Sequence, residues 1–537
     1  MRQHKAPSGL VVSRYGRQAA FGLTLATLAL GGGCMLSNIS VDKCSEAADC
    51  QAAFGLGSTC DDGYCTDPAA CDSGQACRKQ FGAGACLAGL CQATLPAPSE
   101  VPVAVTCPAE LREPADLGTL PMAGPGAPLI IGAIWAQGDP FDAAQGAAVR
   151  LAVREINNTG GLNNGRKLGL VVCDNAGPDA AASDAERTAL NEAALDYLAG
   201  TLGVPAVIGP FTSRDALAVV NHMLAQRYPT LIVSPSATTP QLSAQPDKLD
   251  PSDEYGLFWR TCSSDELQGQ VLANHVVPRA DNMAVAYSND PYGQGLSNVF
   301  LLNRATPPVG ETTPFPFEIG ADYTSLVGNI EAIAAPHPPA DGVLIVSPAA
   351  ADTVAILTAM STTTLASKAI FLTDGSKDAQ TLLDSSLPAA VKTMISAAQG
   401  TAPAVPTSPT YAQFKAELQA TFAVNADEYG FMANSYDAGW VVAYGVVYAS
   451  VAGDGYDGRN VAEGLAHLTS GVAVTVGPTS WANAKLALTT GNREMNIDGV
   501  SGPLDFDSTT GDAPGPIAVW KVNATFDGFD IVDVFVP

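Results

Sequence analysis

Eight cysteines between residues 44 and 91 have the most regular spacing in the chain. The pattern C-x5-C-x8/9-C-x4-C occurs twice, first through Cys44, Cys50, Cys60 and Cys65 and then through Cys71, Cys77, Cys86 and Cys91. Thiol groups clustered in this way either bind a metal ion or pair as disulfides. The segment contains no histidine and no C-x2-C pair, which disfavours a zinc site. The spacing therefore indicates disulfide chemistry in two copies of one unit.

Each of these repeats is shorter than 25 residues and nearly lacks large hydrophobic side chains. Such a short chain cannot build a core and needs cross-links. We predict no metal and two disulfides in each repeat, with three connectivities open in each. Acidic loop residues would also suit calcium, but solvated acidic loops are the favoured interpretation. A rigid stalk or a docking module is the expected role.

Three further cysteines stand apart from the repeats, at Cys107, Cys173 and Cys262. An odd number in an oxidising compartment favours one disulfide and one free thiol. A Cys107–Cys173 bond and a Cys173–Cys262 bond both remain open.

Small hydroxyl residues follow two short apolar runs farther along the chain. Ser213 comes after the run 206–209 at the expected start of a helix, where exposed N–H groups and the helix dipole favour an anion. Ser236, Ala237 and Thr238 come after the run 229–233 and offer backbone N–H groups and the Thr238 hydroxyl. These groups are suited to a carboxylate that loses its water on binding. Helix capping by Ser213 and Thr238 is the alternative, and it is compatible with binding.

Catalytic motifs are missing from the sequence. The five histidines are scattered, and neither an H-E-x-x-H nor a G-x-S-x-G pattern occurs. No phosphate-binding G-x-x-x-x-G-K-[ST] loop occurs either. The 537 residues carry 27 basic and 53 acidic side chains, an excess that opposes nucleic-acid binding. We expect neither an enzyme, nor a cofactor, nor a nucleic-acid partner.

The elements that carry these residues alternate between short apolar strands and amphipathic helices. We expect helices over 143–156, 180–202 and 216–226. We expect strands over 129–134, 168–173, 206–209, 229–233, 283–287, 342–346 and 369–372. This alternation predicts an α/β fold in which parallel sheets are covered by helices on both faces. Ligands in such sheets bind at the loops that follow the strands.

The first 33 residues have the features of a secretory signal peptide. Arg2, Lys5, Arg14 and Arg17 precede an apolar run of about a dozen residues that is too short to span a bilayer. Three glycines then lead to Cys34, which resembles a bacterial lipoprotein signal whose cysteine is lipidated. An ordinary cleaved signal with a free cysteine remains the alternative. No later run could span a membrane, so we expect attachment through the lipid alone, in the bacterial cell envelope, on the periplasmic side or at the outer membrane.

Seven stretches in the rest of the chain resemble the type I periplasmic solute-binding proteins of the branched-chain amino-acid (Leu/Ile/Val) class. They occur in the order found in that family and span most of residues 129–537. They are E-I-N-x-x-G-G from residue 155, V-I-G-P-x-x-S from 207, V-S-P-S-A-T from 233, R-T-x-x-x-D-x-x-Q-G from 260, D-x-Y-G-x-G from 290, Y-D-A from 436 and G-x-x-x-F-D-x-x-x-G-D from 502.

This resemblance implies a two-lobed receptor of the Venus flytrap type, joined by three crossovers, that closes on its ligand like a hinge. We expect lobe 1 over about 129–260 and 405–515 and lobe 2 over about 261–404 and 516–537. The expected order ahead of the lobes is the signal peptide at 1–33, the lipid anchor and cysteine-rich double repeat at 34–94, and a Pro-rich linker at 95–128.

The resemblance also assigns residues to an amino-acid site. The loops that contain Ser213 and residues 236–238 would hold the ligand carboxylate. Asp374 would bind the ammonium group, although a turn-stabilising role is an equal interpretation. Tyr292 would cover the ligand from the second lobe. Two further aromatic residues after the first strand would wall the pocket or serve the core, namely Trp135 and Phe141.

Two functions remain open at this point. The resemblance implies a receptor that delivers an amino acid or similar small polar solute to the permease of an ABC importer. A non-transport sensor or surface-interaction lipoprotein would use the same fold, and the cysteine module favours it. Arg214 stands where the family often has a small hydroxyl residue, so branched-chain amino acids are only the default ligand.

Overall fold

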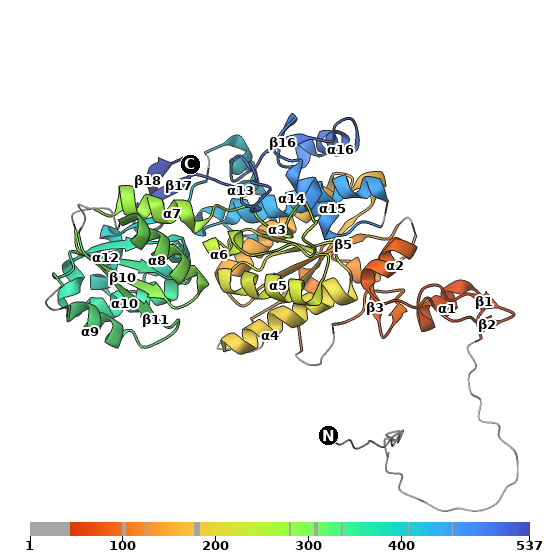
Figure 1. Ribbon diagram of the computed structural model, residues 1–537, viewed down its shortest axis with the longest axis horizontal. Helices are drawn as coiled ribbons and strands as arrows, with labels where there is room; N and C mark the ends of the chain where they lie inside the picture. The colour runs from red at the N-terminus through yellow and green to blue at the C-terminus, as the bar shows by residue number, and fades with distance from the viewer. Residues whose placement is uncertain are drawn as a thin grey trace, which may run out of the picture. The chain divides into compact units, whose positions relative to one another are not determined.

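A computed structural model describes most of the chain and is shown in Figure 1. It covers residues 43–98, 104–124, 126–176, 183–278, 281–304, 310–333, 337–405, 407–453 and 455–536. The predicted signal peptide and lipidation site at Cys34 lie outside these ranges. No helix within them is both long and apolar enough to cross a membrane.

The first lobe is built on a five-stranded parallel sheet with the order β6-β5-β7-β8-β9. Its strands are β5 (Leu129–Trp135), β6 (Leu168–Asp174), β7 (Ala206–Ile208), β8 (Leu231–Ser234) and β9 (Phe258–Arg260). Almost every residue in these strands is buried. Continuous apolar strands of this kind are typical of a sheet covered on both faces.

The helices of this lobe come from two separate parts of the chain. They are α3 (Pro140–Asn158), α4 (Asp184–Leu195), α5 (Ser213–Gln226), α6 (Pro240–Ser243), α13 (Pro409–Phe422), α14 (Met432–Ala449), α15 (Gly458–Ala466) and α16 (Trp481–Thr489). A small sheet of β15 (Val472–Thr475) and β16 (Met495–Asp498) lies among the later ones. Helices α3, α14 and α15 pack directly on the five-stranded sheet. The first lobe is therefore completed by residues that follow the second lobe in the sequence.

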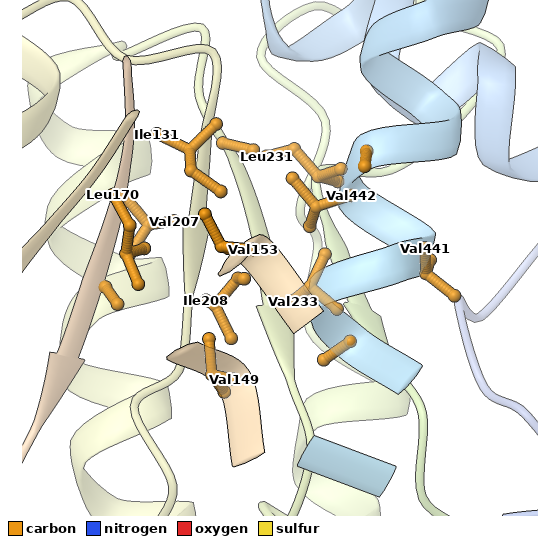
Figure 2. Packing of buried hydrophobic residues seen from close by; sticks show 14 of the residues in the cluster. Ile131, Val149, Val153, Leu170, Val207, Ile208, Leu231, Val233, Val441 and Val442 are labelled. Atoms are coloured by element: carbon orange, nitrogen blue, oxygen red, sulfur yellow. The ribbon is translucent and has the colours of Figure 1, made fainter. Parts of the chain in front are cut away.

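Helix α14 is the central buried helix of the first lobe, and all of its residues are buried. Figure 2 shows Val442 of this helix close to Leu231 and Val233 of β8. Its contact with α3 depends on Gly439, where a Cβ atom would lie 2.6 Å from the Cβ of Ala152. A larger residue at this position would push the two helices apart.

The second lobe contains a seven-stranded sheet with the order β11-β10-β12-β13-β14-β17-β18. Its strands are β10 (Met283–Ser288), β11 (Thr312–Phe317), β12 (Gly342–Val346), β13 (Ala369–Leu372), β14 (Gln399–Pro403), β17 (Ile517–Val522) and β18 (Phe529–Phe535). The first five run parallel, while β17 and β18 add an antiparallel edge. The helices are α7 (Asp265–Val271), α8 (Pro291–Arg304), α9 (Thr324–Glu331), α10 (Ala350–Met360), α11 (Ala379–Leu382) and α12 (Ala389–Ala397).

Both faces of the second sheet are buried, as its residue pattern shows. Ala284 and Ala286 of β10 belong to one apolar cluster, whereas Met283 and Val285 belong to another. Alternate residues of a strand point to opposite faces, so each cluster fills one face. The predicted α/β class with two lobes and helix-covered parallel sheets is confirmed.

The chain passes between the two sheets three times, after β9, after β14 and before β17. These passages agree with the crossovers that the resemblance implies. The exact lobe limits stay a prediction.

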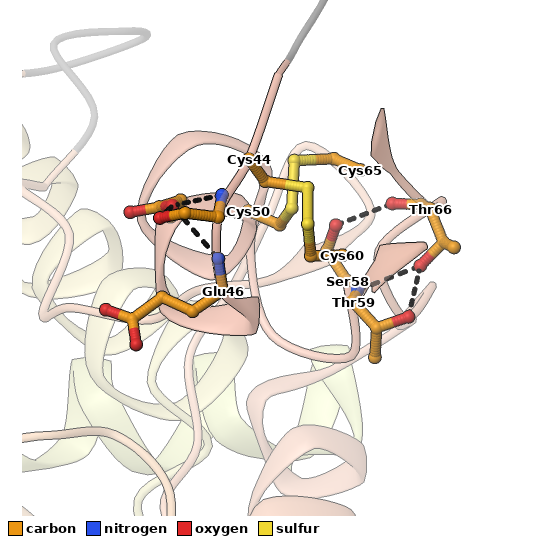
Figure 3. The surroundings of a disulfide bond; sticks show 10 residues. Cys44, Glu46, Cys50, Ser58, Thr59, Cys60, Cys65 and Thr66 are labelled. Atoms are coloured by element: carbon orange, nitrogen blue, oxygen red, sulfur yellow. Dashed lines mark hydrogen bonds between the residues drawn. A yellow bond between two sulfur atoms is a disulfide. The ribbon is translucent and has the colours of Figure 1, made fainter. Parts of the chain in front are cut away.

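The cysteine repeats fold as the spacing predicts, and the structure selects one connectivity for both. The first cysteine of each repeat pairs with the third and the second with the fourth: Cys44–Cys60, Cys50–Cys65, Cys71–Cys86 and Cys77–Cys91. Each repeat has one short helix, α1 (Ala47–Phe54) or α2 (Gly74–Phe81), and one hairpin, β1 (Cys60–Asp61) with β2 (Tyr64–Cys65) or β3 (Cys86–Leu87) with β4 (Leu90–Cys91). Figure 3 shows the two disulfides of the first repeat side by side.

The second repeat is joined to the first lobe by packing. Cys77 and Cys91 belong to the same apolar cluster as the first sheet. The guanidinium of Arg78 donates a hydrogen bond to the carbonyl of Tyr456 over 2.6 Å. The repeat is therefore docked on the lobe and not suspended from it.

The described part of the predicted linker, 95–98, 104–124 and 126–128, is also anchored to the first lobe. A disulfide joins Cys107 to Cys173 in β6. The backbone of Glu113 exchanges hydrogen bonds with Leu170 of the same strand, and Leu117 and Met122 are buried. The many prolines hide this packing from a search for periodicity, because they break regular elements without preventing burial.

Disulfide mapping tests this arrangement. Digestion of the unreduced protein should release the four repeat pairs and the Cys107–Cys173 pair. Cys262 is 1% exposed, so a maleimide should label it only after unfolding. A Cys173–Cys262 peptide, or rapid labelling of Cys262 in the folded protein, would contradict the structure.

Candidate functional site

A cavity of about 380 Å³ lies where the loops of both sheets meet. The first lobe contributes the loops or helix starts that follow β5, β6, β7 and β8, together with Phe431 ahead of α14. The second lobe contributes the starts of α8 and α10 and the loop after β13. The lining residues that the argument uses are Phe141, Asp142, Gln145, Ser213, Ser236, Tyr292 and Asp374. The cavity therefore has the location that ligand sites take in parallel α/β sheets.

Another cavity, of about 950 Å³, lies between α13 and the β17–β18 hairpin. None of the predicted site residues lines it. We take the smaller cavity as the candidate site, because it contains convergent buried polar groups.

Five of the eight predicted ligand residues line the candidate site, namely Phe141, Ser213, Ser236, Tyr292 and Asp374. The other three are fully buried behind its wall, namely Trp135, Ala237 and Thr238. Trp135 stacks on Phe211 with ring centroids 5.5 Å apart. Of these two residues, Phe211 is the one that lines the cavity. Trp135 therefore supports the wall from the core.

Two predicted serines join the loops that carry them. The backbone N–H of Thr239 donates to Ser213 Oγ over 3.2 Å, and Ser236 Oγ donates to the carbonyl of Phe211 over 2.9 Å. The loop after β7 and the loop after β8 are thus connected in both directions. The Thr238 hydroxyl is buried and has no hydrogen-bond partner among the described residues. It lies next to the Asp265 carboxyl, whose pKa it lowers, and it does not line the cavity.

Asp374 is held on the second-lobe side of the cavity by two side chains. The Tyr292 hydroxyl donates to Asp374 Oδ1 over 2.7 Å, and Gln268 Nε2 donates to the same oxygen over 2.6 Å. Burial raises the pKa of the Asp374 carboxyl above its ordinary value. Its position on the cavity fits the predicted ammonium-binding role. Turn stabilisation stays an equal interpretation of the same residue.

A second carboxyl, Asp265, strengthens this negative region and was not predicted as a site residue. It is completely buried, and neither of its carboxylate oxygens has a hydrogen-bond partner among the described residues. Burial and then the charge of Asp374 raise the pKa of Asp265 well above its ordinary value. The charge of Asp374 thus adds to the effect of burial on Asp265, and the nearby Arg260 offsets only part of it, so this region favours a further cation. The sequence signal was present in the D-x-x-Q-G stretch, which also supplies Gln268.

Arg260 fixes the loop after β8 from behind. Its side chain is fully buried and donates to the carbonyls of Ala237 and Thr239 over 3.0 and 3.1 Å. It also donates to Asp512 Oδ1 over 2.7 Å. A buried cation of this kind requires these acceptors, so it holds the backbone on both sides of Thr238 in place.

The first turns of α3 supply two polar residues that sequence reasoning missed. Phe141 was predicted, and Asp142 and Gln145 follow it at i+1 and i+4 on the side of the helix that faces the cavity. Burial and then Asp139 raise the pKa of Asp142 to about 7. A helical face drawn through Phe141 would have identified Gln145 at i+4, and Asp142 lies three residues before Gln145 on the adjoining face.

Arg214, the residue that departs from the family pattern, lines the cavity and forms ion pairs with Asp184 and Asp215. It is therefore neither a lone solvent-facing residue nor an unpaired cation.

A family model described as periplasmic binding protein matches residues 130–528 of this chain. Over 185 residues the chain is 25% identical to the leucine-, isoleucine-, valine-, threonine-, and alanine-binding protein of Pseudomonas aeruginosa, covering 34% of this chain and 42% of that protein. Over 153 residues it is 30% identical to Leu/Ile/Val-binding protein homolog 3 of Brucella melitensis, covering 28% of this chain and 35% of that protein. The matches thus span less than half of either relative.

Solved structures show the same fold. The leucine-binding protein LivK of Thermotoga maritima is similar with a TM-score of 0.57 and 17% identity, over 76% of this chain and 99% of that one. LivJ of Streptococcus pneumoniae in complex with isoleucine is similar with a TM-score of 0.56 and 18% identity, over 76% of this chain and 99% of that one. A solute-binding protein of R. palustris in complex with 4-hydroxybenzoate has a TM-score of 0.57 and 16% identity, over 76% of this chain and 97% of that one.

Removal of the acid that pairs with Arg260 should destabilise the first lobe. We expect Asp512→Ala to lower the free energy of unfolding by about 3 kcal/mol, because it leaves a buried guanidinium without its counter-ion. Urea denaturation measures the effect. Lys415→Ala, which breaks the exposed Lys415–Asp427 pair, is the matched control and should cost less than about 1 kcal/mol. Equal losses in the two variants would contradict the role given to Arg260.

Asp142 should make the stability of the ligand-free protein depend on pH. Between its ordinary pKa of 3.8 and its folded value of about 7, the folded carboxyl holds a proton that the unfolded chain has lost. The free energy of unfolding should therefore fall as the pH rises from 5 to 7 and change little through this group above that range. His222, whose pKa is raised by a hydrogen bond to Asp196, acts in the same direction.

The contribution of Asp142 is isolated by comparing the protein with Asp142→Asn at pH 5 and pH 8. The free energy of unfolding should differ less between pH 5 and pH 8 in the variant than in the unmodified protein. The decrease in this difference should be on the order of 2 kcal/mol. Thermal unfolding monitored by circular dichroism measures it. An unchanged pH dependence in the variant would mean that Asp142 is not protonated in the folded protein.

Proposed function

Because the chain belongs to the periplasmic binding protein family, we propose that it is an extracytoplasmic receptor that closes its two lobes on a free amino acid. The observation that carries this proposal is the buried acidic pair of Asp374 and Asp265 beside Tyr292. An ammonium group beside Asp374 would supply positive charge to this acidic region, where Arg260 offsets only part of the charge of Asp265. Its binding would let both carboxyls ionise while still out of water.

The carboxylate of the ligand would lie against the first lobe. Ser213 stands at the first turn of α5, where backbone N–H groups are exposed and the helix dipole is positive. The unpartnered hydroxyl of Thr238 lies on the neighbouring loop, which Arg260 holds in place. An amino acid oriented in this way would touch both lobes and would stabilise the closed arrangement.

The similar proteins support a small ligand of this size. LivJ is in complex with isoleucine and the R. palustris protein with 4-hydroxybenzoate, and the Pseudomonas relative is described as binding five amino acids. The aromatic acid has a carboxylate but no ammonium group. It would leave the acidic pair of this chain without a partner, so we favour the amino acid.

Delivery to the permease of an ABC importer is the proposed role of the bound receptor. Anchoring through a lipid on Cys34 would keep it in the cell envelope, and the five disulfides suit an oxidising compartment. A sensor or surface-interaction lipoprotein is the second candidate. The observation that favours it is the cysteine module docked on the first lobe, which offers an additional surface. Uptake of the identified ligand by cells with and without the gene distinguishes the two roles.

Thermal unfolding of the purified full chain with the twenty amino acids, benzoate and 4-hydroxybenzoate tests the proposal. A ligand that binds only the folded state adds about 2.7 kcal/mol of stability at a hundredfold excess over its Kd. At least one amino acid should stabilise the protein, and the two aromatic acids should not. No stabilisation by any amino acid at millimolar concentration would refute amino-acid binding.

The ammonium site is tested by Asp374→Asn. This variant should weaken binding of the stabilising amino acid by about a hundredfold, because it removes a charge that the ligand needs in a buried site. Asp384→Asn changes an exposed carboxylate and is the matched control. Isothermal titration calorimetry measures both. Equal affinity in Asp374→Asn and the control would remove Asp374 from the site.

A further inference from the structure

Gln145 brings an unsatisfied amide to the wall of the candidate site. Its side chain is fully buried, and the Ser435 hydroxyl lies 3.1 Å from one end of the amide. The other end has no partner among the described residues. The Ser435 hydroxyl also donates to the carbonyl of Phe431, and exchanging the two ends of the amide would still leave one end unpaired. A buried polar group of this kind costs about 1–3 kcal/mol unless something binds to it.

Asp142 lies beside Gln145 on the same wall. Its carboxylate accepts a hydrogen bond from the backbone N–H of Ala136 over 3.1 Å. The nearest cation on the wall is Arg187, and its guanidinium is held by Asp215 at 2.8 Å. Asp142 therefore has acceptor capacity left, and no side-chain cation of the described wall is dedicated to it.

The sheet order places this wall away from the loop after β8, which would bind the carboxylate. Gln145 and Asp142 follow β5, Ser213 follows β7, and Ser236 follows β8, which are neighbours in that order. Adjacent strands lie about 4.8 Å apart, so the α3 wall and the loop after β8 are separated by roughly 10 Å. This is about the length of an amino acid with a long side chain. The far end of the ligand would thus meet Gln145 and Asp142.

The charges around the cavity indicate which kind of group would suit this end. Five carboxyl side chains line it, namely Asp139, Asp142, Asp290, Asp374 and Asp378. Two arginines also line it, Arg187 and Arg214, and both already pair with acids. The excess of negative charge opposes a ligand with a second carboxylate. A branched aliphatic chain would leave the free end of the Gln145 amide without a partner and would give the Asp142 carboxyl no second hydrogen bond.

We infer that the ligand is an amino acid whose side chain ends in a nitrogen group, a carboxamide, an ammonium or a guanidinium, received by Asp142 and Gln145. The inference rests on the proposed function and narrows it to nitrogen-terminated side chains. The N–H groups of the ligand bind the carboxylate of Asp142. The free Nε2 of the Gln145 amide donates to the oxygen of a carboxamide, and with the two ends of the amide exchanged the free oxygen accepts from an ammonium or a guanidinium. Phe141 and Phe211 provide apolar surface for the methylene groups between the two ends.

Matched ligand pairs test the inference on the unmodified full chain. Glutamine and glutamate have nearly the same shape, as do lysine and norleucine, and arginine and leucine complete the set. We expect glutamine, lysine or arginine to bind at least tenfold more tightly than glutamate, norleucine and leucine in isothermal titration calorimetry. Which of the three binds best identifies the terminal group. Tighter binding of leucine or norleucine would overturn the inference and leave the proposed function intact. Binding of no amino acid would overturn both.

Two variants then test the residues. Gln145→Leu and the nearly isosteric Asp142→Asn should each weaken the best nitrogen-terminated ligand by about tenfold and change the affinity for norleucine by less than about threefold. Gln413→Leu replaces an exposed glutamine of α13 and should change neither. Asp142→Asn alone decides the matter if Gln145→Leu does not fold. An equal loss of affinity for both ligands would indicate a structural role and would overturn the assignment.

Discussion

The buried guanidinium of Arg260 is the interaction on which the arrangement of the site depends. A cation with no exposure to water must find acceptors, and Arg260 finds them in two backbone carbonyls of the loop after β8 and in Asp512, which lies 252 residues later. The same contacts fix Thr238 and connect the first crossover to the last segment of the first lobe. The loop after β8 is held in place because a charge beneath it requires these acceptors.

The candidate site departs from the rule that buried polar groups are satisfied. Asp265, Thr238 and Gln145 all have buried polar atoms without partners among the described residues. Most of the surrounding loop contacts are complete, as in the mutual bonds of Ser213 and Ser236 with neighbouring loops. Unsatisfied groups in an otherwise consistent structure tend to mark function. Among these groups Gln145 lines the cavity, while Thr238 and Asp265 are fully buried and do not line it.

The cysteine repeats and the Pro-rich segment show a different solution to stability. Neither could build a core alone, and both rely on cross-links and on the first lobe. The Cys107–Cys173 disulfide and the burial of Leu117 attach the Pro-rich segment along β6, and Cys77 joins the core of the lobe. The described part of the N-terminal region therefore belongs to the first lobe in structural terms and gives this lobe an additional outer surface.

The amino-acid sequence by itself determined the alternating α/β pattern, the disulfide repeats and the loops that carry Ser213, Ser236 and Asp374. These features depend on local spacing and on the order of elements along the chain. Only the tertiary structure decided which cysteines pair, that Trp135 supports the wall from the core, and that Gln145 reaches the cavity. Such facts depend on which segments meet in space, because burial and unpaired hydrogen-bonding groups arise between residues far apart in the sequence.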